Sequence, residues 1–140
     1  MEALAAAPRV RLRPLLPPER PQLAAWCPGY NRAAAQELVA VLLTNDQMVG
    51  VLGYGLNDPG EGCCTFHLAV IAPDRRGFGL GSEAVRALEG HLAATMGVRC
   101  FRALVPETMG LAFYFWLRLG YAPDACRQGQ MSMVRCQGGG

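Results

Sequence analysis

The segment APDRRGFGLGSEAV, residues 72–85, holds three glycines at alternate positions between two arginines and a run of helical character. Glycine lets the backbone adopt conformations that other residues avoid, so several N–H groups can point into one concavity and attract an anion. The unpaired N–H groups and the positive dipole end of a helix that begins there add to this attraction. With Arg75 and Arg76 beside it, the segment is predicted to bind a phosphate or a pyrophosphate.

Two familiar phosphate-binding loops do not fit this segment. The Walker loop requires a lysine, and all 13 basic residues of the chain are arginines. The dinucleotide-binding loop, started at Gly77, requires an acidic residue about twenty positions later, where Val98, Arg99 and Cys100 stand instead. A surface turn that binds nothing is also disfavoured, because a predicted strand precedes the glycines and a predicted helix follows them.

The composition is that of one domain spanning residues 1–140, because 51% of the residues are hydrophobic and 17% are charged. No run of 18 apolar residues occurs, and residues 1–14 lack the apolar segment of a secretory signal, so we expect a cytoplasmic protein without a membrane span. The formal net charge is +2, and the arginines are dispersed without interleaved aromatic residues. This distribution argues against nucleic-acid binding.

Six cysteines occur in apolar, strand-like surroundings without regular spacing. Since no secretory signal accompanies them, we expect free, buried thiols rather than a disulfide framework. Cys63, Cys64 and His67 are close in sequence, but no second ligand pair with the spacing of a zinc site is present. The sequence therefore predicts no metal site.

The order of predicted elements implies a mixed sheet. Alternation of charged and apolar residues predicts a first strand, and a proline-rich stretch predicts two short, broken helices. The first predicted elements are a strand over 9–15, helices over 18–26 and after Pro28, and strands over 37–44, 48–56 and 63–71. A helix from the glycines to Gly97, a strand over 98–105 and a helix over 109–119 capped by Thr108 follow. The chain ends with one or two strands, the last over 130–137, and a disordered tail over 137–140. Strands 63–71 and 98–105 should run parallel, joined by a right-handed crossover.

The helix after the glycines is predicted to be amphipathic. Its apolar residues recur at helical spacing and are Ala84, Val85, Leu88, Leu92 and Met96. Three charged residues, Glu83, Arg86 and Glu89, lie away from that stripe.

The glycine segment resembles the pyrophosphate-binding loop of the GNAT superfamily of N-acetyltransferases, which use acetyl-CoA. The loop pattern of that family, Gln or Arg followed by x-x-Gly-x and then Gly or Ala, is met by Arg76, Gly79 and Gly81. A Pro-x-x-Arg-Gly spacing, frequent in the family, is met by Pro73, Arg76 and Gly77.

A second match lies in GLAFYFWLRLGY, residues 110–121, which resembles a family helix ending in Ala-x-x-Phe-Tyr-x-x-x-Gly-Phe. The residues in register are Ala112, Phe115, Gly120 and Tyr121. The resemblance extends in order over residues 37–121. It implies an α+β fold, in which a mostly antiparallel sheet of six to seven strands has a central parallel pair splayed around CoA and about four flanking helices.

The resemblance implies acetyl-CoA as the co-substrate and no metal. Backbone N–H groups from Arg76 to Ser82 would hold the pyrophosphate, and residues 69–71 would pair with the pantetheine arm. An N–H group near Val70 or Ile71 would polarise the thioester carbonyl. The implied cofactor contacts are Ala69, Val70, Ile71, Arg75, Arg76, Gly77, Phe78, Gly79, Leu80, Gly81, Ser82 and Trp116.

Transfer to an amine requires a base, because a primary amine with a pKa of about 10.4 is protonated at neutral pH. His67 is the candidate, since it lies four residues before Ile71, and a few members of the family have a catalytic histidine at that position. Strand alternation puts Thr65, His67 and Ala69 on one face, with Thr65 where other members carry a catalytic glutamate. The alternative is a half-buried structural histidine that bonds a neighbouring carbonyl.

In many members of the family a tyrosine of the second matching helix protonates the departing CoA thiolate. Alignment on Gly120 puts Trp116 at that position, and an indole N–H is not a usable acid at neutral pH. Tyr114 lies about 200° around the helix from Trp116 and could act as the acid only if the helix is shifted. The alternative for Tyr114 is a core aromatic residue. Met109 stands where an asparagine often contacts the cofactor.

Two functions remain open at this point. The first is an N-acetyltransferase that moves an acetyl group from acetyl-CoA to a primary amine of a small molecule or peptide by direct attack in a ternary complex. The second is a GNAT-fold domain that binds CoA or an acyl-CoA with little or no transfer, as a sensor or interaction module. The acceptor site is expected from residues 26–32, the turn after Leu56 and residues 122–129, and a homodimer is left open.

Overall fold

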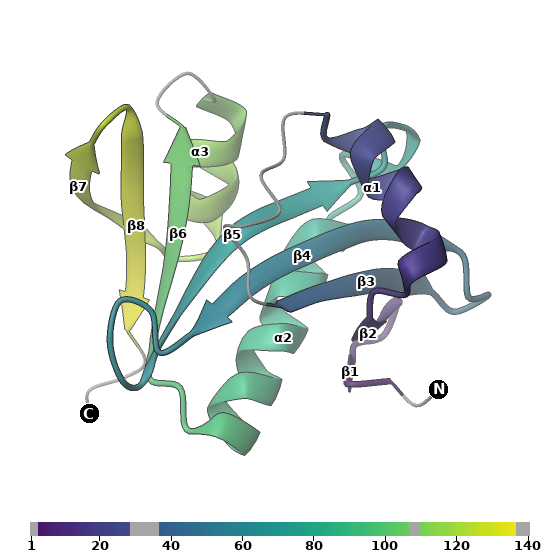
Figure 1. Ribbon diagram of the computed structural model, residues 1–140, viewed down its shortest axis with the longest axis horizontal. Coiled ribbons are helices and arrows are strands. Elements are labelled where there is room, and N and C mark those ends of the chain that lie inside the picture. Colours follow the sequence, from purple (N-terminus) through teal and green to yellow (C-terminus); the bar gives the residue numbers. More distant parts are fainter. Residues whose placement is uncertain (1–2, 29–36, 107–109, 137–140) are drawn as a thin grey trace.

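The computed structural model describes residues 3–28, 37–106 and 110–136, and the described strands form one eight-stranded mixed sheet (Figure 1). They are β1 (Ala5–Ala6), β2 (Val10–Pro14), β3 (Glu37–Leu43), β4 (Met48–Leu56), β5 (Cys63–Ile71), β6 (Cys100–Pro106), β7 (Ala122–Arg127) and β8 (Gln130–Cys136). Their order across the sheet is β1-β2-β3-β4-β5-β6-β8-β7. All neighbouring strands pair antiparallel except β5 and β6, which run parallel.

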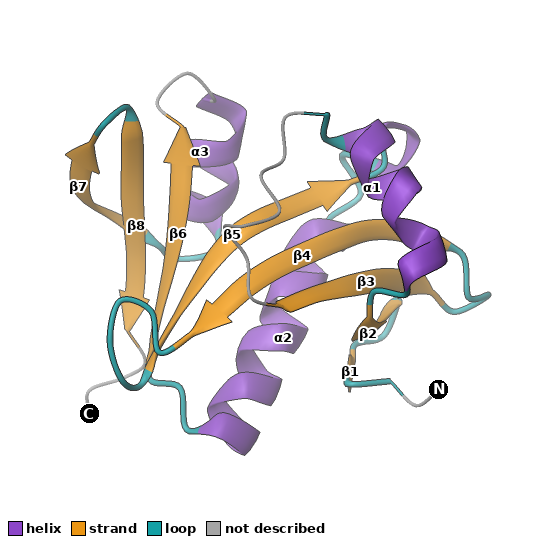
Figure 2. Ribbon diagram, in the orientation of Figure 1, coloured by secondary structure: helices purple, strands orange, loops and turns teal. Residues whose placement is uncertain are grey.

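The α-helices of the described residues cover both faces of this sheet (Figure 2). They are α1 (Arg20–Trp26), which follows a 3-10 turn at Pro17–Glu19, α2 (Leu80–Met96) and α3 (Gly110–Arg118). On one face, Leu23 of α1 packs with Val51 and Val70. On the other face, α2 and α3 pack on the larger core. No helix in the described parts of the chain has the length and apolar character needed to cross a membrane.

The parallel strands β5 and β6 separate after four paired residues. The pairs run from Cys63 with Cys100 to Phe66 with Ala103, and beyond them β5 pairs only with β4 and β6 only with β8. Figure 1 shows the two arrows diverging from this point. The predicted α+β fold with a splayed parallel pair is therefore confirmed, and α2 connects the two strands as the sequence predicted.

The apolar stripe of α2 faces the sheet as expected, with two differences at single residues. The residues at helical spacing that are buried in the core are Ala84, Val85, Leu88 and Leu92. Met96 is 57% exposed, because it is the last residue of the helix. Glu89, expected away from the stripe, is only 1% exposed, because Tyr121 and Arg135 reach its carboxylate.

The C-terminal end of the chain is a hairpin of β7 and β8 (Figure 1). Gln128 and Gly129 both have positive φ, 52° and 78°, which suits a two-residue turn between twisted strands. The predicted acceptor segment 122–129 therefore forms the edge of the sheet, separated from β5 by β6 and β8. The second predicted short helix, the predicted cap at Thr108 and the predicted tail over 137–140 lie outside the described residues.

The expectation that all cysteines are free is wrong for one pair. Cys100 and Cys136 face each other in the register of β6 and β8 and form a disulfide. The two residues are 36 positions apart, so no local pattern pointed to this contact. Of the cysteines outside this disulfide, Cys64 is buried and Cys126 is exposed.

Candidate functional site

The glycine loop follows the end of β5 and leads into α2. A 3-10 turn at Pro73–Arg75 comes first, and two glycines in the left-handed region follow, Gly77 with φ 88° and Gly79 with φ 77°. Residues with a Cβ rarely adopt this conformation, which explains why glycine occupies both positions. Gly79 is the N-cap of α2, and its carbonyl accepts the first helical hydrogen bond, from the N–H of Glu83 at 3.1 Å.

The backbone N–H groups of the loop have no acceptors within the described residues. Because the first N–H groups of an α-helix lack intrahelical partners, those of Leu80, Gly81 and Ser82 remain unpaired at the head of α2. No side chain caps this helix, and the N–H groups of Gly77 to Gly79 donate to no other described residue. A row of unpaired donors at the positive end of a 17-residue helix favours an anion.

Two arginines of the sequence motif flank this row. Arg76 is exposed and donates from Nε to the carbonyl of Ile71 at 3.0 Å, which ties it to the end of β5. Arg75 donates from Nη2 to Oε1 of Gln47 at 3.0 Å. Both predicted side chains therefore lie beside the loop.

Arg9 is a third arginine at the loop, and the sequence analysis missed it. Its backbone N–H and Nε donate to the carboxylate of Glu83 at 2.7 and 2.8 Å, and its Nη1 donates to the carbonyl of Phe78 at 2.8 Å. Burial alone raises the pKa of Glu83, but the hydrogen bonds from Arg9 outweigh burial and hold this pKa below its ordinary value. Arg9 precedes Phe78 by 69 residues, so no local pattern could have linked them.

Gly81 serves a different purpose from Gly77 and Gly79. A Cβ on Gly81 would lie 3.1 Å from Cε1 of Phe115 in α3 and 3.3 Å from Cγ1 of Ile71 in β5. The residue is buried, so the absence of a side chain lets the first turn of α2 approach α3 and the end of β5. The two sequence matches, the glycine loop and the aromatic helix, are thus in direct contact.

A β-bulge lies at the predicted catalytic histidine. The register between β4 and β5 changes from Tyr54 opposite Phe66 to Gly53 opposite Leu68, which leaves His67 as the extra residue of β5. The bulge reverses the alternation of side chains, because Phe66 packs in the core under α2 whereas Leu68 packs on the α1 side.

Because of this bulge, Ala69 does not share a face with His67, contrary to the predicted alternation. Leu68 and Val70 both pack on the α1 side, and Ile71 packs against the core on the opposite side. Residues in a strand alternate between faces, so Ala69 belongs with Ile71.

The main chain at the end of β5 offers donors to the gap beside β6. The N–H of Ala72 donates to the carbonyl of Val49 in β4 at 2.8 Å. Since main-chain groups of successive residues point to opposite sides of a strand, the N–H of Val70 also faces β4, and those of Ala69 and Ile71 face the open side. Of the two predicted carbonyl-binding residues, Ile71 fits this geometry and Val70 does not.

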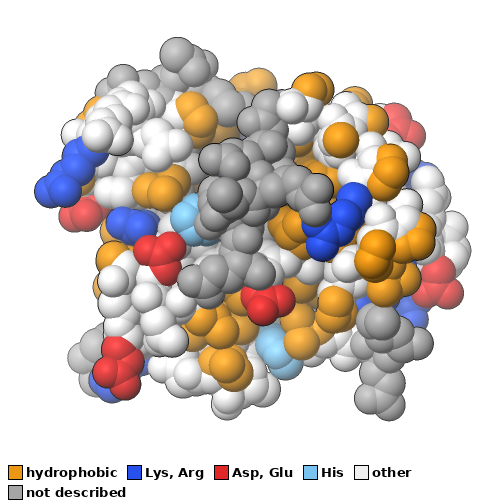
Figure 3. Space-filling view, in the orientation of Figure 1, with side chains coloured by type: hydrophobic (Ala, Val, Ile, Leu, Met, Phe, Trp, Pro, Cys, Tyr) orange, Lys and Arg blue, Asp and Glu red, His pale blue; other side chains and the backbone are white. Residues whose placement is uncertain are grey.

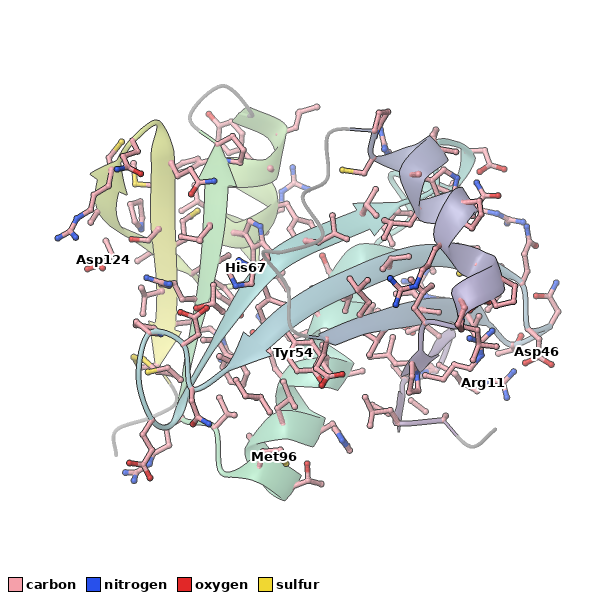
Figure 4. All side chains as sticks on the ribbon, in the orientation of Figure 1. Arg11, Asp46, Tyr54, His67, Met96 and Asp124 are labelled. Atoms are coloured by element: carbon pink, nitrogen blue, oxygen red, sulfur yellow. A yellow bond between two sulfur atoms is a disulfide. The ribbon has the colours of Figure 1, made fainter. Side chains whose placement is uncertain are left out.

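His67 takes part in a polar cluster that the sequence did not reveal. Its Nε2 lies 3.1 Å from Oδ2 of Asp58, and Oδ1 of Asp58 accepts from Nη2 of Arg102 at 3.3 Å. Thr65 donates from Oγ1 to the backbone carbonyl of Asp58 at 2.7 Å and accepts from Nε of Arg102 at 3.1 Å. Thr65 and His67 therefore share a face, as predicted, and Figure 4 shows His67 between β5 and β6 where the strands diverge.

The two aromatic candidates of α3 have opposite surroundings. Trp116 is 5% exposed, and its ring lies 5.4 Å from the ring of Phe66 and 4.8 Å from that of Tyr121. Tyr114 is 58% exposed and contacts only the ring of Phe113 among the described aromatic residues. The alternative that Tyr114 is a core aromatic residue is therefore wrong.

A cavity of about 280 Å³ lies elsewhere, on the α1 side of the sheet. Its lining comes from α1, the residues just after it and Leu38 of β3, and it includes neither the glycine loop nor His67. Figure 3 shows apolar side chains exposed around this region of the surface.

Comparison with known proteins relates the whole fold to one family. The acetyltransferase (GNAT) family model matches residues 3–121. An acetyltransferase from Thermus thermophilus has a TM-score of 0.75 at 22% identity, covering 91% of this chain and 97% of that one. Spermidine N-acetyltransferase from Vibrio cholerae, in complex with CoA and spermine, has a TM-score of 0.72 at 13% identity, covering 94% and 97%.

A third similar structure is RimL, a ribosomal L7/L12 alpha-N-protein acetyltransferase, with a TM-score of 0.72 at 15% identity, covering 96% of this chain and 98% of that one. At identities this low, the solved structures establish the shared fold alone. No curated protein sequence matches the chain.

Proposed function

The chain belongs to the acetyltransferase (GNAT) family, and from this premise we propose that it transfers an acetyl group from acetyl-CoA to a primary amine. The observation that carries the proposal is the row of unpaired N–H groups from Gly77 to Ser82, which begins α2 beside the gap between β5 and β6. The acceptor is an amine of a small molecule or peptide. The reaction is a direct attack with both substrates bound, and its place is the cytoplasm.

The chemistry of the loop fits the pyrophosphate of CoA. Its donors are backbone N–H groups, which carry no charge and cost no side-chain entropy to hold in position. Arg76 adds a positive charge held by the carbonyl of Ile71, and Arg75 adds another beside it. Acetyl-CoA supplies the activated acetyl group. The chain's own residues bind and orient the two substrates and exchange protons with them.

The open side of β5 fits the rest of the cofactor. The N–H groups of Ala69 and Ile71 face the gap, where they can pair with an extended amide-containing arm as another strand would, and the Ile71 carbonyl accepts from Arg76. The N–H of Ile71 is the donor best suited to the thioester carbonyl. A donor aimed at a developing oxyanion lowers the activation free energy by roughly 3 kcal/mol.

His67 is the group that accepts the proton of the amine. It is partly buried at the point where β5 and β6 diverge, next to the expected thioester position. General-base catalysis by a positioned side chain typically raises the reaction rate 10²- to 10⁴-fold. An acceptor that is an ammonium ion at neutral pH requires an increase of about this size.

A covalent acetyl-enzyme is disfavoured. Cys64 is the buried thiol nearest in sequence to His67, and burial raises the pKa of Cys64 to about 12, so that its thiolate is scarce at neutral pH. Cys64 also faces the core on the α2 side, away from the cluster around His67. Direct attack by the amine is therefore the simpler route.

The CoA thiolate does not need a tyrosine to leave. The aligned position is Trp116, which is packed among aromatic rings, and Tyr114 is largely exposed on α3. A thiolate with a pKa near that of cysteine, about 8.5, can take its proton from water. We therefore assign the protonation of the CoA thiolate to solvent rather than to Tyr114, and we assign Trp116 to packing beside the cofactor.

A thiol-release assay with acetyl-CoA and a panel of amines tests the proposal. The wild-type chain should release CoA with at least one primary amine, and His67→Gln should lower kcat by 10²- to 10⁴-fold while the KM for acetyl-CoA stays the same. Release that His67→Gln leaves unaltered removes His67 from the mechanism.

One alternative has a specific observation in its favour. Because Trp116 replaces the tyrosine of the family and is buried, the chain could bind CoA or an acyl-CoA as a sensor with little transfer. Tight CoA binding without turnover on any amine is the result that favours this second function.

A further inference from the structure

We propose that Asp58 is a positioning residue that fixes the tautomer of His67, so that Nδ1 rather than Nε2 faces the acceptor amine. The proposal rests on the function proposed above, in which His67 is the base. Asp58 belongs to the loop between β4 and β5, nine residues before His67, in the turn after Leu56 from which part of the acceptor site was expected.

The contacts of His67 select one nitrogen. Its Nε2 lies 3.1 Å from the Asp58 carboxylate, and the imidazole has no other hydrogen-bond partner within the described residues. A carboxylate accepts hydrogen bonds but donates none, so Nε2 carries the hydrogen and Nδ1 holds the lone pair. The free nitrogen of the ring is then Nδ1.

Arg102 holds the Asp58 carboxylate, and Thr65 holds the backbone of Asp58. Its second oxygen accepts from Arg102 at 3.3 Å, and Arg102 is fixed by donating to Thr65 at 3.1 Å. Thr65 is fully buried and donates to the backbone carbonyl of Asp58 at 2.7 Å. The carboxylate therefore cannot turn away from His67 without losing its contact with Arg102, and the backbone that carries it is held by Thr65.

The loop that carries Asp58 is anchored as well. The N–H of Cys63 donates to the carbonyl of Gly60 at 3.1 Å, and the carbonyl of Gly62 accepts from Arg99 and Cys100 at 2.9 and 3.2 Å. These bonds tie the loop to the first residues of β5 and β6. A base held this way does not have to be oriented during the reaction.

The proton path follows from this arrangement. Nδ1 first takes one proton from the acceptor ammonium and passes it to solvent, which leaves a neutral amine with a lone pair. The amine then attacks the thioester carbonyl, its second proton passes to Nδ1 as the C–N bond forms and the C–S bond breaks, and the CoA thiolate takes a proton from water. The imidazolium that results carries one positive charge beside the Asp58 carboxylate, which offsets it. The proton then leaves from Nδ1 to solvent, and the starting tautomer is restored.

The bulge in β5 lies at His67 itself. A regular strand would place His67 in the ladder opposite Gly53 or Tyr54, whereas the extra residue is free of this pairing. Bulges often redirect a side chain next to an active site. Here the His67 side chain stays on the face of Thr65, where it meets the loop carboxylate, and the residues after the bulge change faces.

Nitrogen-15 NMR of the imidazole tests the tautomer directly, at a pH where the ring is neutral. The wild-type chain should show a protonated Nε2 and an unprotonated Nδ1, and Asp58→Asn should shift the population toward a protonated Nδ1, because the amide NH₂ can donate to Nε2. A wild-type ring protonated on Nδ1 overturns the proposal.

Steady-state kinetics on the same variants separate positioning from a structural role. Asp58→Asn should lower kcat by about 100-fold while the KM for acetyl-CoA and the melting temperature stay close to wild type. Asp58→Glu keeps a carboxylate and should recover part of kcat. Asp46→Asn, in the exposed turn between β3 and β4, is the matched control and should behave as wild type.

The outcomes also separate this proposal from the function on which it rests. Unaltered kcat in Asp58→Asn, with transfer by the wild type intact, contradicts the positioning role alone. If no amine is acetylated by the wild type but the Nε2–H tautomer is present and depends on Asp58, the positioning role stands and the transferase function fails.

Discussion

Gly79 combines two constraints that make it the most sensitive single residue of the loop. Its φ of 77° is unfavourable for any side chain, and a Cβ would lie 3.3 Å from Nη2 of Arg9. A larger residue there must change the path of the main chain just where the unpaired N–H groups begin.

Gly79→Val should therefore raise the KM for acetyl-CoA at least about tenfold with a smaller effect on kcat, because binding rather than chemistry is disturbed. Gly90→Ala, in the middle of α2 with no atom within 4 Å of the new Cβ, is the control and should leave KM unaltered. Equal KM values for the two variants would count against the loop as the cofactor site.

Arg102 joins the two strands at the base of the gap through Asp58 and Thr65. Arg102→Met should lower kcat, because the freed carboxylate no longer holds His67 in one orientation, and the KM for acetyl-CoA should stay constant. Stopped-flow measurement of the transfer step checks this, and a change confined to KM contradicts it.

At the level of secondary-structure elements, the turn before β2 and the start of α2 are joined by the Arg9–Glu83 pair. The pKa of Glu83 is lowered in the folded protein, despite burial, by hydrogen bonds from Arg9. A carboxyl of this kind stabilises the fold fully above its ordinary pKa of 4.5 and loses the contribution as the pH falls through the lowered value.

Thermal unfolding should consequently show that Glu83→Gln destabilises the chain at pH 7, and that the difference from wild type shrinks as the pH falls below 4.5. A difference in melting temperature that does not depend on pH over this range would mean that the charge of Glu83 is not involved.

A second pair of elements is joined inside the core. Glu89 of α2 accepts from Tyr121 at 2.5 Å and from Arg135 of β8 at 2.8 Å, and its side chain is 2% exposed. Burial, followed by the charge of Glu89, raises the pKa of Tyr121 far above its usual range, so the phenol stays a donor. Arg135→Met leaves the carboxylate without its main counter-charge.

Arg135→Met should lower the free energy of unfolding by roughly 3 kcal/mol, because the buried Glu89 carboxylate then keeps only the longer ion pair with Arg86, at 3.3 Å. Chemical denaturation measures the loss. The double variant Glu89→Leu with Arg135→Met should recover much of it, since an apolar pair can replace a buried ion pair, and failure to recover argues for packing rather than charge.

Over the whole molecule, local patterns allowed the sequence to predict the fold. The apolar segment of β5, the apolar stripe of α2 and the glycine loop between them are each contained in a short segment, and together they specify the parallel pair. The edge strand β7 was only partly foreseen, because Pro123 and exposed residues give it no alternation of burial.

The parts of the site that were missed depend on contacts between distant residues. Arg9 reaches the loop across 69 positions, and Arg102 reaches Asp58 across 44. The bulge at His67 is invisible in a residue pattern, since it arises from the pairing of β5 with β4. Only the loop and His67 itself could be read from the order of amino acids.

The central claim is that the main-chain amides from Gly77 to Ser82 bind the pyrophosphate of CoA, and an amide NMR titration with CoA tests it most directly. The largest chemical-shift changes should fall on the N–H signals of residues 76–82, with those of Ala69 and Ile71 next. Signals of these residues that stay unaltered at millimolar CoA, or changes confined to another surface, would contradict it.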